Sequence, residues 1–438
     1  MKIKSLHLRG IGQFEELNLK FAPYPEKLFN NTLIIGSNGA GKSTILESVA
    51  IGFSWFVSRI RSEKGAGMPI SELKINNSFA SGQITIITEH DNEEFEWTVS
   101  KAKRGKKTER PTRLEGLNRL VNQYKDRYSV DDKLSFPLLL FYDANRGVLD
   151  IPLKIRGKHT FEQMDGYDNA LRGIVDYRRF FEWYREREDV ENEKKIRVLE
   201  SFKPGHNMDE VFRQLNKLSD IQLMAVKSAL ESFLPELKNF RVQRKPRLHM
   251  AVDKNGAPLN VEQLSQGEKL TMALVGDIAR RLAIMNPSME NPLIGSGVVL
   301  IDEAELHLHP KWQRSLVGRL KDTFPNIQFI ITTHSPLLIS DEKDLLCYSL
   351  DFGRLAEIDP LYGEDVNNVL IKAMDTDIRN QEVELKIRSL MNAVQDKNLE
   401  DAKILLIELG MELPKDHIEM VKARLLIKRL QLQNESHN

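Results

Sequence analysis

Residues 36–43 have the sequence Gly36-Ser37-Asn38-Gly39-Ala40-Gly41-Lys42-Ser43, which fits the pattern G-x-x-x-x-G-K-[ST]. An apolar run at 32–35 precedes this stretch, and residues typical of a helix follow it at 44–50. A strand, a glycine-rich turn and a helix in this order are the setting that a phosphate-binding loop requires. Glycines let the backbone wrap closely around phosphate, and the N–H groups at the helix start point toward it. The alternative, a glycine-rich turn that binds nothing, does not account for this context.

The motif also predicts what individual side chains do. Lys42 is expected to reach the outer phosphates of a nucleotide, and the hydroxyl of Ser43 is expected to ligate Mg²⁺. The residues predicted to bind the nucleotide are Gly36, Ser37, Asn38, Gly39, Ala40, Gly41, Lys42, Ser43 and Thr44.

Length and composition restrict the class of protein. The 438 residues suggest two or three domains. Basic and acidic residues number 63 each, so a nucleic-acid partner would need a local basic patch. Cys347 is the only cysteine, which excludes an intrachain disulfide and a cysteine-based zinc site and fits a reducing compartment. No apolar run has the length of a membrane span. We therefore expect a cytoplasmic protein without a membrane partner.

Two further apolar runs end in residues suited to nucleotide hydrolysis. The run at 298–303 ends in Asp302 and Glu303, and the run at 327–333 is followed by His334. Hydrolysis needs magnesium ligands, a group that orients water and a contact to the γ-phosphate. We expect Asp302 to hold Mg²⁺ and two catalytic residues, Glu303 polarising the attacking water and His334 bonding the γ-phosphate. The alternatives are two acids that cap a strand and a structural histidine.

The segment Leu-Ser-Gln-Gly-Glu at 264–268 precedes a further helical run. It resembles the Leu-Ser-Gly-Gly-Gln signature of ABC-class ATPases, and its order relative to the other motifs matches the SMC/RecF/OLD-like group of that class. The sequence departs from the signature at Gln266 and Glu268. The resemblance covers residues 1–340. It implies an α/β fold, an ABC-type P-loop ATPase with a mixed sheet and flanking helices.

In that group, ATP lies between two subunits. The resemblance implies that Ser265, Gln266, Gly267 and Glu268 of one copy close over the nucleotide bound by the phosphate loop of another. A serine and a glycine at a helix start are suited to binding a second face of an anion. The chain is therefore expected to be a homo-oligomer, a dimer or larger, with ATP and Mg²⁺ as cofactors.

A looser resemblance concerns the PtuA ATPases of Septu-type anti-phage systems. Residues 137–146, the aromatic cluster at 180–188 and the helical tail carry it. Those ATPases act with a separate HNH-type nuclease, PtuB. The resemblance implies a sensor and scaffold that controls a PtuB-like nuclease and has no nuclease site of its own. The Asp-x-Asp at 375–377 is expected to be a helix cap, and His307 and His309 lack the spacing of zinc ligands.

The expected organisation has four parts. An N-terminal ATPase lobe covers 1–160, a helical insertion covers 161–245, and a C-terminal ATPase lobe covers 246–362. Residues 363–438 are expected to form a C-terminal helical region that binds the partner. The basic stretch at 101–113 is either a solvated loop or a contact to a nucleic-acid backbone.

Two other functions compete with the defence ATPase. One is a RecF-like DNA-repair ATPase, and the other is a transporter ATPase subunit. A transporter subunit needs neither the helical insertion nor the helical tail. The C-terminal region separates the first two functions, because only the defence ATPase needs it to bind a nuclease.

Overall fold

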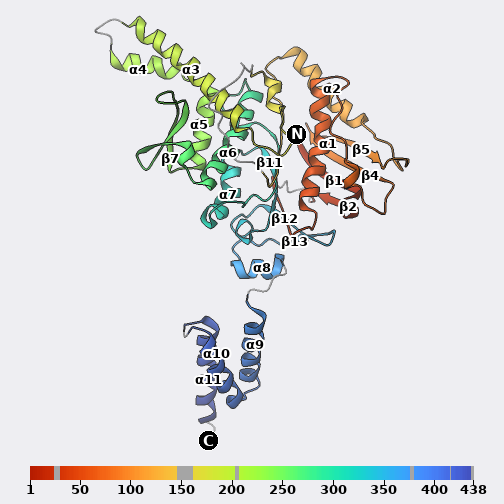
Figure 1. Ribbon diagram of the computed structural model, residues 1–438, viewed down its shortest axis with the longest axis vertical. Helices are drawn as coiled ribbons and strands as arrows, with labels where there is room; N and C mark the ends of the chain where they lie inside the picture. The colour runs from red at the N-terminus through yellow and green to blue at the C-terminus, as the bar shows by residue number, and fades with distance from the viewer. Residues whose placement is uncertain (24–29, 146–160, 203–206, 375–378, 415, 436–438) are drawn as a thin grey trace. The chain divides into compact units, whose positions relative to one another are not determined.

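The computed structural model describes residues 1–23, 30–145, 161–202, 207–374, 379–414 and 416–435 (Figure 1). The chain divides into two compact units, Met1–Val366 and Asn367–Asn438. The larger unit contains three β-sheets with their helices. Within the described ranges, no helix is both long enough and apolar enough to cross a membrane.

A six-stranded sheet carries the predicted site. Its order is β13-β12-β3-β11-β10-β6, and the neighbours from β12 to β6 pair in parallel. Since parallel strands end at the same edge, the residues that follow β3, β10 and β11 are brought together there. The strands are β3 (Asn31–Gly36), β6 (Leu138–Tyr142), β10 (Gly297–Ile301), β11 (Ile327–Thr333), β12 (Leu345–Asp351) and β13 (Arg354–Ile358).

A second sheet is antiparallel and has the order β2-β1-β4-β5. Asp91 and Asn92 form the turn of a hairpin between the third and fourth strands of that order, and both residues have positive φ, 50° and 63°. The strands are β1 (Lys2–Ile11), β2 (Phe14–Lys20), β4 (Ser81–His90) and β5 (Glu93–Ala102).

Helix α1 (Lys42–Arg61) continues from the phosphate loop and lies against the antiparallel sheet, beside α2 (Glu115–Val130) (Figure 1). The Trp97 Nε1 group donates to the Gly52 carbonyl at 3.1 Å. A Cβ atom at Gly52 would come within 2.0 Å of Ile86 Cδ1, so a larger residue there would displace the Ile86 side chain. The helix that follows the loop is therefore fixed in place by the sheet.

The range 161–245 was expected to be helical, and this is only partly right. It contains α3 (Tyr177–Ser201), α4 (Met208–Lys217) and α5 (Ile221–Phe233), but also the strand β7 (Leu237–Gln243). β7 begins a three-stranded sheet with β8 (His249–Lys254) and β9 (Ala257–Asn260), so this sheet crosses the expected boundary at 245. A register shift between Lys238 and Arg241 interrupts β7, and the positive φ of Asn239 lies within it. That bulge breaks the alternation of buried and exposed residues that marks a strand.

The smaller unit is helical over its described residues. Helices α9 (Gln381–Gln395), α10 (Leu399–Glu412) and α11 (Ile418–Glu435) share a core of their own, and α8 (Val366–Met374) precedes them. The Asp-x-Asp motif at 375–377 lies outside the described residues. The core is formed by Ile387, Leu390, Val394, Ala402, Leu409, Met420, Ala423 and Ile427.

Candidate nucleotide-binding site

The phosphate loop lies between β3 and α1, as the sequence predicts. Gly39 and Gly41 have positive φ, 79° and 97°, and Gly41 is the N-cap of α1 without a side-chain cap. A Cβ atom at Gly41 would come within 2.6 Å of Phe14 Cζ, while the side chain of Gln13 donates to the Ala40 carbonyl. The turn between β1 and β2 thus supports the loop, a role for Gln13 that no local pattern signalled.

Lys42 is surrounded by acceptors at the centre of the site. Its Nζ atom lies 2.9 Å from the Gly36 carbonyl oxygen, 3.0 Å from that of Ser37 and 2.7 Å from His334 Nε2. Burial lowers the pKa of Lys42, and nearby carboxylates, Asp302 first among them, act in the opposite direction. An anionic phosphate beside this ammonium would likewise favour its charged form.

Asp302 and Glu303 follow β10 and are fixed by the neighbouring strand. The Thr332 hydroxyl donates to Asp302 Oδ1 and accepts the backbone N–H of Glu303 at 2.9 Å. The Asp302 N–H donates to the Tyr142 carbonyl at 2.8 Å. Asp302 is 2% exposed, so its carboxylate is oriented by protein groups and not by bulk water. Thr332 and Tyr142 are positioning residues that the sequence patterns did not indicate.

His334 follows β11 and lies beside the same lysine. Its backbone N–H donates to Glu305 Oε1 at 2.5 Å, and its ring faces Lys42. Burial is the main cause that lowers the pKa of His334, and the positive charge of Lys42 adds to it. The structure therefore brings the phosphate loop, the carboxylates after β10 and His334 together at one sheet edge.

The signature segment forms the start of α6 (Gln266–Met285). Ser265 is the N-cap and makes a reciprocal capping box with Glu268: its hydroxyl accepts from the Glu268 N–H at 3.3 Å, and its N–H donates to Glu268 Oε2 at 2.9 Å. The Ser265 hydroxyl also donates to Glu268 Oε2, at 2.7 Å. Lys254 Nζ binds the other oxygen of Glu268 at 2.7 Å. Glu268 is buried by these contacts, whereas Ser265 and Gln266 are exposed. Glutamine could cap this helix in the same way, so the departure at position 268 adds the charged contact with Lys254.

Gly267 is required by its own chain. A Cβ atom there would come within 2.6 Å of the His307 carbonyl oxygen, and His307 has a φ of 63°. Its neighbour His309 is the N-cap of α7 (Pro310–Thr323) through its Nδ1 atom, 3.3 Å from the Lys311 N–H. The segment after the carboxylates is therefore folded tightly against the signature. In the described parts of the chain, no group of three or more His, Cys, Asp or Glu side chains is arranged to hold a metal.

A buried polar network joins the signature helix to the central sheet. The Tyr142 hydroxyl donates to Asp277 Oδ2 at 2.9 Å, and Arg280 and Arg281 also bind this carboxylate. Arg281 continues to the Gly166 carbonyl at 2.6 Å. Because the Tyr142 carbonyl also accepts from the backbone after β10, one residue contacts both the carboxylate segment and α6.

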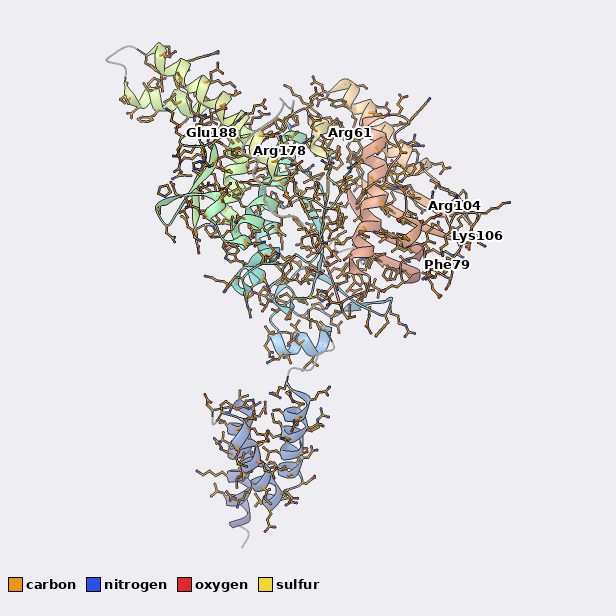
Figure 2. All side chains as sticks on the ribbon, viewed as in Figure 1. Arg61, Phe79, Arg104, Lys106, Arg178 and Glu188 are labelled. Carbon is orange, nitrogen blue, oxygen red and sulfur yellow. The ribbon has the colours of Figure 1, made fainter. Side chains whose placement is uncertain are left out.

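The basic stretch at 101–113 lies at the end of β5 and in the loop after it. Lys103 Nζ is used within the fold, since it donates to the Asn76 carbonyl at 2.9 Å. Arg104 and Lys106 are exposed, and Figure 2 shows both at the edge of the larger unit. The loop is therefore open to solvent on its basic side.

The residues of this edge fit a bound Mg·ATP. The left-handed glycines of the loop and the uncapped start of α1 present backbone N–H groups, which bind phosphate. Lys42 supplies a positive charge, and a hydroxyl and a carboxylate, Ser43 and Asp302, are the oxygen donors that Mg²⁺ prefers. Fold and site together define a P-loop ATPase of the SMC/ABC-like class.

Comparison with known proteins identifies the family. The family model AAA_21, an AAA domain whose description also names the AbiEii toxin of a Type IV TA system, matches residues 32–340. The chain belongs to this family of AAA domains. It is 34% identical over 383 residues to "Retron Vc95 probable ATPase" of Vibrio cholerae, covering 79% of this chain and 74% of the relative.

Two further proteins extend the comparison. "Septu protein PtuA" of Bacillus thuringiensis is 25% identical over 350 residues, covering 77% of this chain and 72% of the relative. Among solved structures, the SMC head domain from Thermotoga maritima has a TM-score of 0.40 and 15% identity, covering 82% of this chain and 98% of that one. The match to the Septu protein confirms the expected kinship with PtuA ATPases.

Proposed function

We propose that this protein hydrolyses ATP at sites shared between two copies and, through ATP-dependent assembly, controls a partner nuclease of HNH type in anti-phage defence. In this proposal the phosphate loop and Lys42 bind the phosphates, and Ser43 and Asp302 hold Mg²⁺. When bound, the metal neutralises phosphate charge. Glu303 orients the attacking water, and His334 bonds the γ-phosphate.

The observation that carries the shared site is the surface at the start of α6. Ser265 and Gln266 are exposed there, while the contacts of Glu268 are made within its own chain. Helix starts with serine and glycine bind anions, so this surface is suited to a second phosphate face. The phosphate that this surface would bind belongs to a nucleotide held by the phosphate loop of another copy.

The shared site is tested by the variant Glu303→Gln, which keeps the side-chain shape and removes the charge that polarises water. We expect it to bind ATP, to lose at least about 100-fold in kcat, and to accumulate as an ATP-bound dimer in size-exclusion chromatography with light scattering. Lys311→Gln, an exposed change on α7, serves as the control. Normal turnover in Glu303→Gln would contradict the assigned role.

Control of a partner nuclease is supported by the kinship with a Septu protein and by the smaller unit. On α10, Ile404, Ile407 and Met411 are 55%, 66% and 79% exposed, and they recur on one helix face. On α11, Ile418 and Leu425 are 63% and 64% exposed with the same helical spacing. Exposed apolar faces of this kind are typical of protein interfaces. We name these five residues the apolar stripe.

Co-purification tests the nuclease partner. We expect a tagged wild-type chain, expressed from its native locus, to isolate with a small HNH-type nuclease. The double variant Ile407→Glu, Leu425→Glu should lose that protein, because charge on the apolar stripe opposes its burial. Leu73→Glu makes the same kind of change at a residue that is 96% exposed in the larger unit, and it should keep the partner.

The same experiment separates the defence ATPase from the DNA-repair alternative. The exposed basic side chains Arg104 and Lys106 favour that alternative, since they are suited to a phosphate backbone. If the chain isolates alone and DNA ends stimulate its ATPase, the repair function replaces the proposal.

A further inference from the structure

The segment after the two site carboxylates folds back on itself. The Leu306 N–H donates to the Glu303 carbonyl at 3.1 Å, and the Leu308 N–H donates to the Glu305 carbonyl at 2.9 Å. Glu303 has a positive φ of 46°, which few residues with a side chain adopt. Such conformations cluster at functional sites. The turn returns the side chain of Glu305 to the end of β11, where His334 lies.

The carboxylate of Glu305 has two unequal oxygens. Oε1 accepts the His334 backbone N–H at 2.5 Å. Oε2 is buried and has no hydrogen-bond partner among the described protein groups. A buried carboxylate oxygen without a partner is costly, and protein folding alone would favour glutamine or an apolar residue there. The role of Glu305 therefore lies in the bond that its Oε1 accepts from the His334 backbone.

Glu305 also acts on the two groups that face each other across the site. Its charge raises the pKa of Lys42 and of His334, against the burial that lowers both. Lys42 Nζ and His334 Nε2 are 2.7 Å apart, so a small displacement of the histidine backbone changes this contact. Glu305 is the side chain that fixes that backbone from outside β11.

We propose that Glu305 is a positioning residue for ATP hydrolysis, which fixes the backbone of His334 so that its ring is directed at the γ-phosphate. The inference rests on the proposed role of His334. Glu305 neither contacts the nucleotide nor transfers a proton. It sets the position of a group that does, and a misplacement of about 1 Å in a site can reduce rates about 100-fold.

A double-mutant cycle tests this. Glu305→Ala removes the acceptor, and we expect kcat to fall about 10- to 100-fold while the KM for ATP changes by less than about threefold. Glu305→Gln keeps an oxygen that accepts the N–H, so it should retain at least about half of the wild-type kcat. In a His334→Ala background, Glu305→Ala should have almost no further effect, because the group that it positions is already absent.

The control separates positioning from loosening of the chain. Gln313 accepts from the Ser335 hydroxyl at 2.7 Å and donates to the Leu308 carbonyl at 2.9 Å, so Gln313→Ala frees the segments around both His334 and Glu305 without removing the acceptor of the His334 N–H. We expect its kcat to stay within about threefold of wild type. Wild-type kcat in Glu305→Ala, equal losses in the Ala and Gln variants, or an undiminished loss in the His334→Ala background would each overturn the inference. Full activity of His334→Ala alone would instead overturn the role of His334 in the proposed function.

Discussion

The phosphate loop and the signature both lie at a helix start, but the structure caps the two helices differently. Helix α1 begins at Gly41, with a left-handed N-cap, no side-chain cap and no acidic residue in the first turn. Helix α6 begins at Ser265, with a complete capping box and Glu268 in the first turn. A helix start without a cap has N–H groups available for a ligand, whereas a capped start has already satisfied some of them.

In the proposed shared site, this difference would let one chain supply two unlike halves. The first half binds phosphate with backbone groups and Lys42. At the second half, the hydroxyl of Ser265 already donates to Glu268 at 2.7 Å, so contact with a γ-phosphate must compete with that bond. We therefore expect the phosphate loop to bind nucleotide before assembly and the signature to change its partners on assembly.

Replacing the glycine N-cap of α1 with serine should have the largest effect. Gly41→Ser places a Cβ atom within 2.6 Å of Phe14 Cζ at a φ of 97°. We expect this to cost about 1–3 kcal/mol of stability and to abolish measurable ATP binding, because the loop must move. Thermal unfolding and titration with a fluorescent ATP analogue measure both quantities. Gly39→Ser is the matched variant, since a Cβ there meets nothing within 4 Å, and it should bind more tightly than Gly41→Ser.

Replacing the serine N-cap of α6 with glycine should leave the fold intact. Ser265→Gly places glycine at the N-cap, where glycine is tolerated, so the free energy of unfolding should change by only about 0.3 kcal/mol. We expect ATP binding by the chain's own loop to be unchanged and kcat to fall about 10- to 100-fold, because a transition-state contact is lost. Steady-state kinetics measure kcat and the binding titration measures ATP affinity, so the two effects can be separated. A variant with wild-type kcat would show that the signature is only a helix cap.

The stability that the cap of α6 contributes depends on pH because of Glu268. Burial alone would raise its pKa, but hydrogen bonds from Lys254 and Ser265 hold the pKa below the ordinary value of 4.5. As pH falls, the unfolded chain therefore protonates Glu268 at a higher pH than the folded chain does. The stabilisation is complete above pH 4.5 and is lost as pH falls through the lower pKa of Glu268 in the folded protein. Glu268→Gln keeps a side chain that can complete the capping box but loses the charge that binds Lys254, so it should lower stability by about 1 kcal/mol at pH 7. The gap between its melting temperature and that of wild type should narrow toward pH 4, and a gap independent of pH would contradict this.

The smallest effect is expected at Tyr142, which joins the carboxylate segment after β10 to the signature helix α6. Tyr142→Phe removes the hydroxyl that binds Asp277, while Arg280 and Arg281 still neutralise that carboxylate. We expect a stability loss of about 1 kcal/mol and a fall in kcat of less than about threefold. Tyr184→Phe loses a buried bond to the Phe240 carbonyl, so it should lose similar stability at unchanged kcat. Equal kcat in the two variants would mean that Tyr142 only stabilises the fold.

The sequence predicted those parts of the site that depend on neighbouring residues. The phosphate loop and the strands that lead to Asp302 and His334 were recognisable, because turn residues and apolar runs are local. The contacts that orient these residues were not. Glu305 binds a backbone group 29 residues away, and Tyr142 binds a side chain 135 residues away. Such pairs exist only once the strands are ordered in the sheet.

The shared site is tested most directly by mixing two inactive variants. Lys42→Ala removes the lysine of the phosphate loop, and Ser265→Arg places a bulky side chain at the signature. Each should be nearly inactive alone. A mixed dimer has one site in which both defects meet and one in which neither is present. Mixed dimers are verified by pull-down with two different tags.

An equal mixture of the two variants should recover about a quarter of the wild-type ATPase rate, since half of randomly formed dimers are mixed and each keeps one intact site. Recovery at this level is the result that a site shared between copies predicts. If verified mixed dimers remain as inactive as either variant alone, each chain hydrolyses ATP with its own residues and the central claim is wrong.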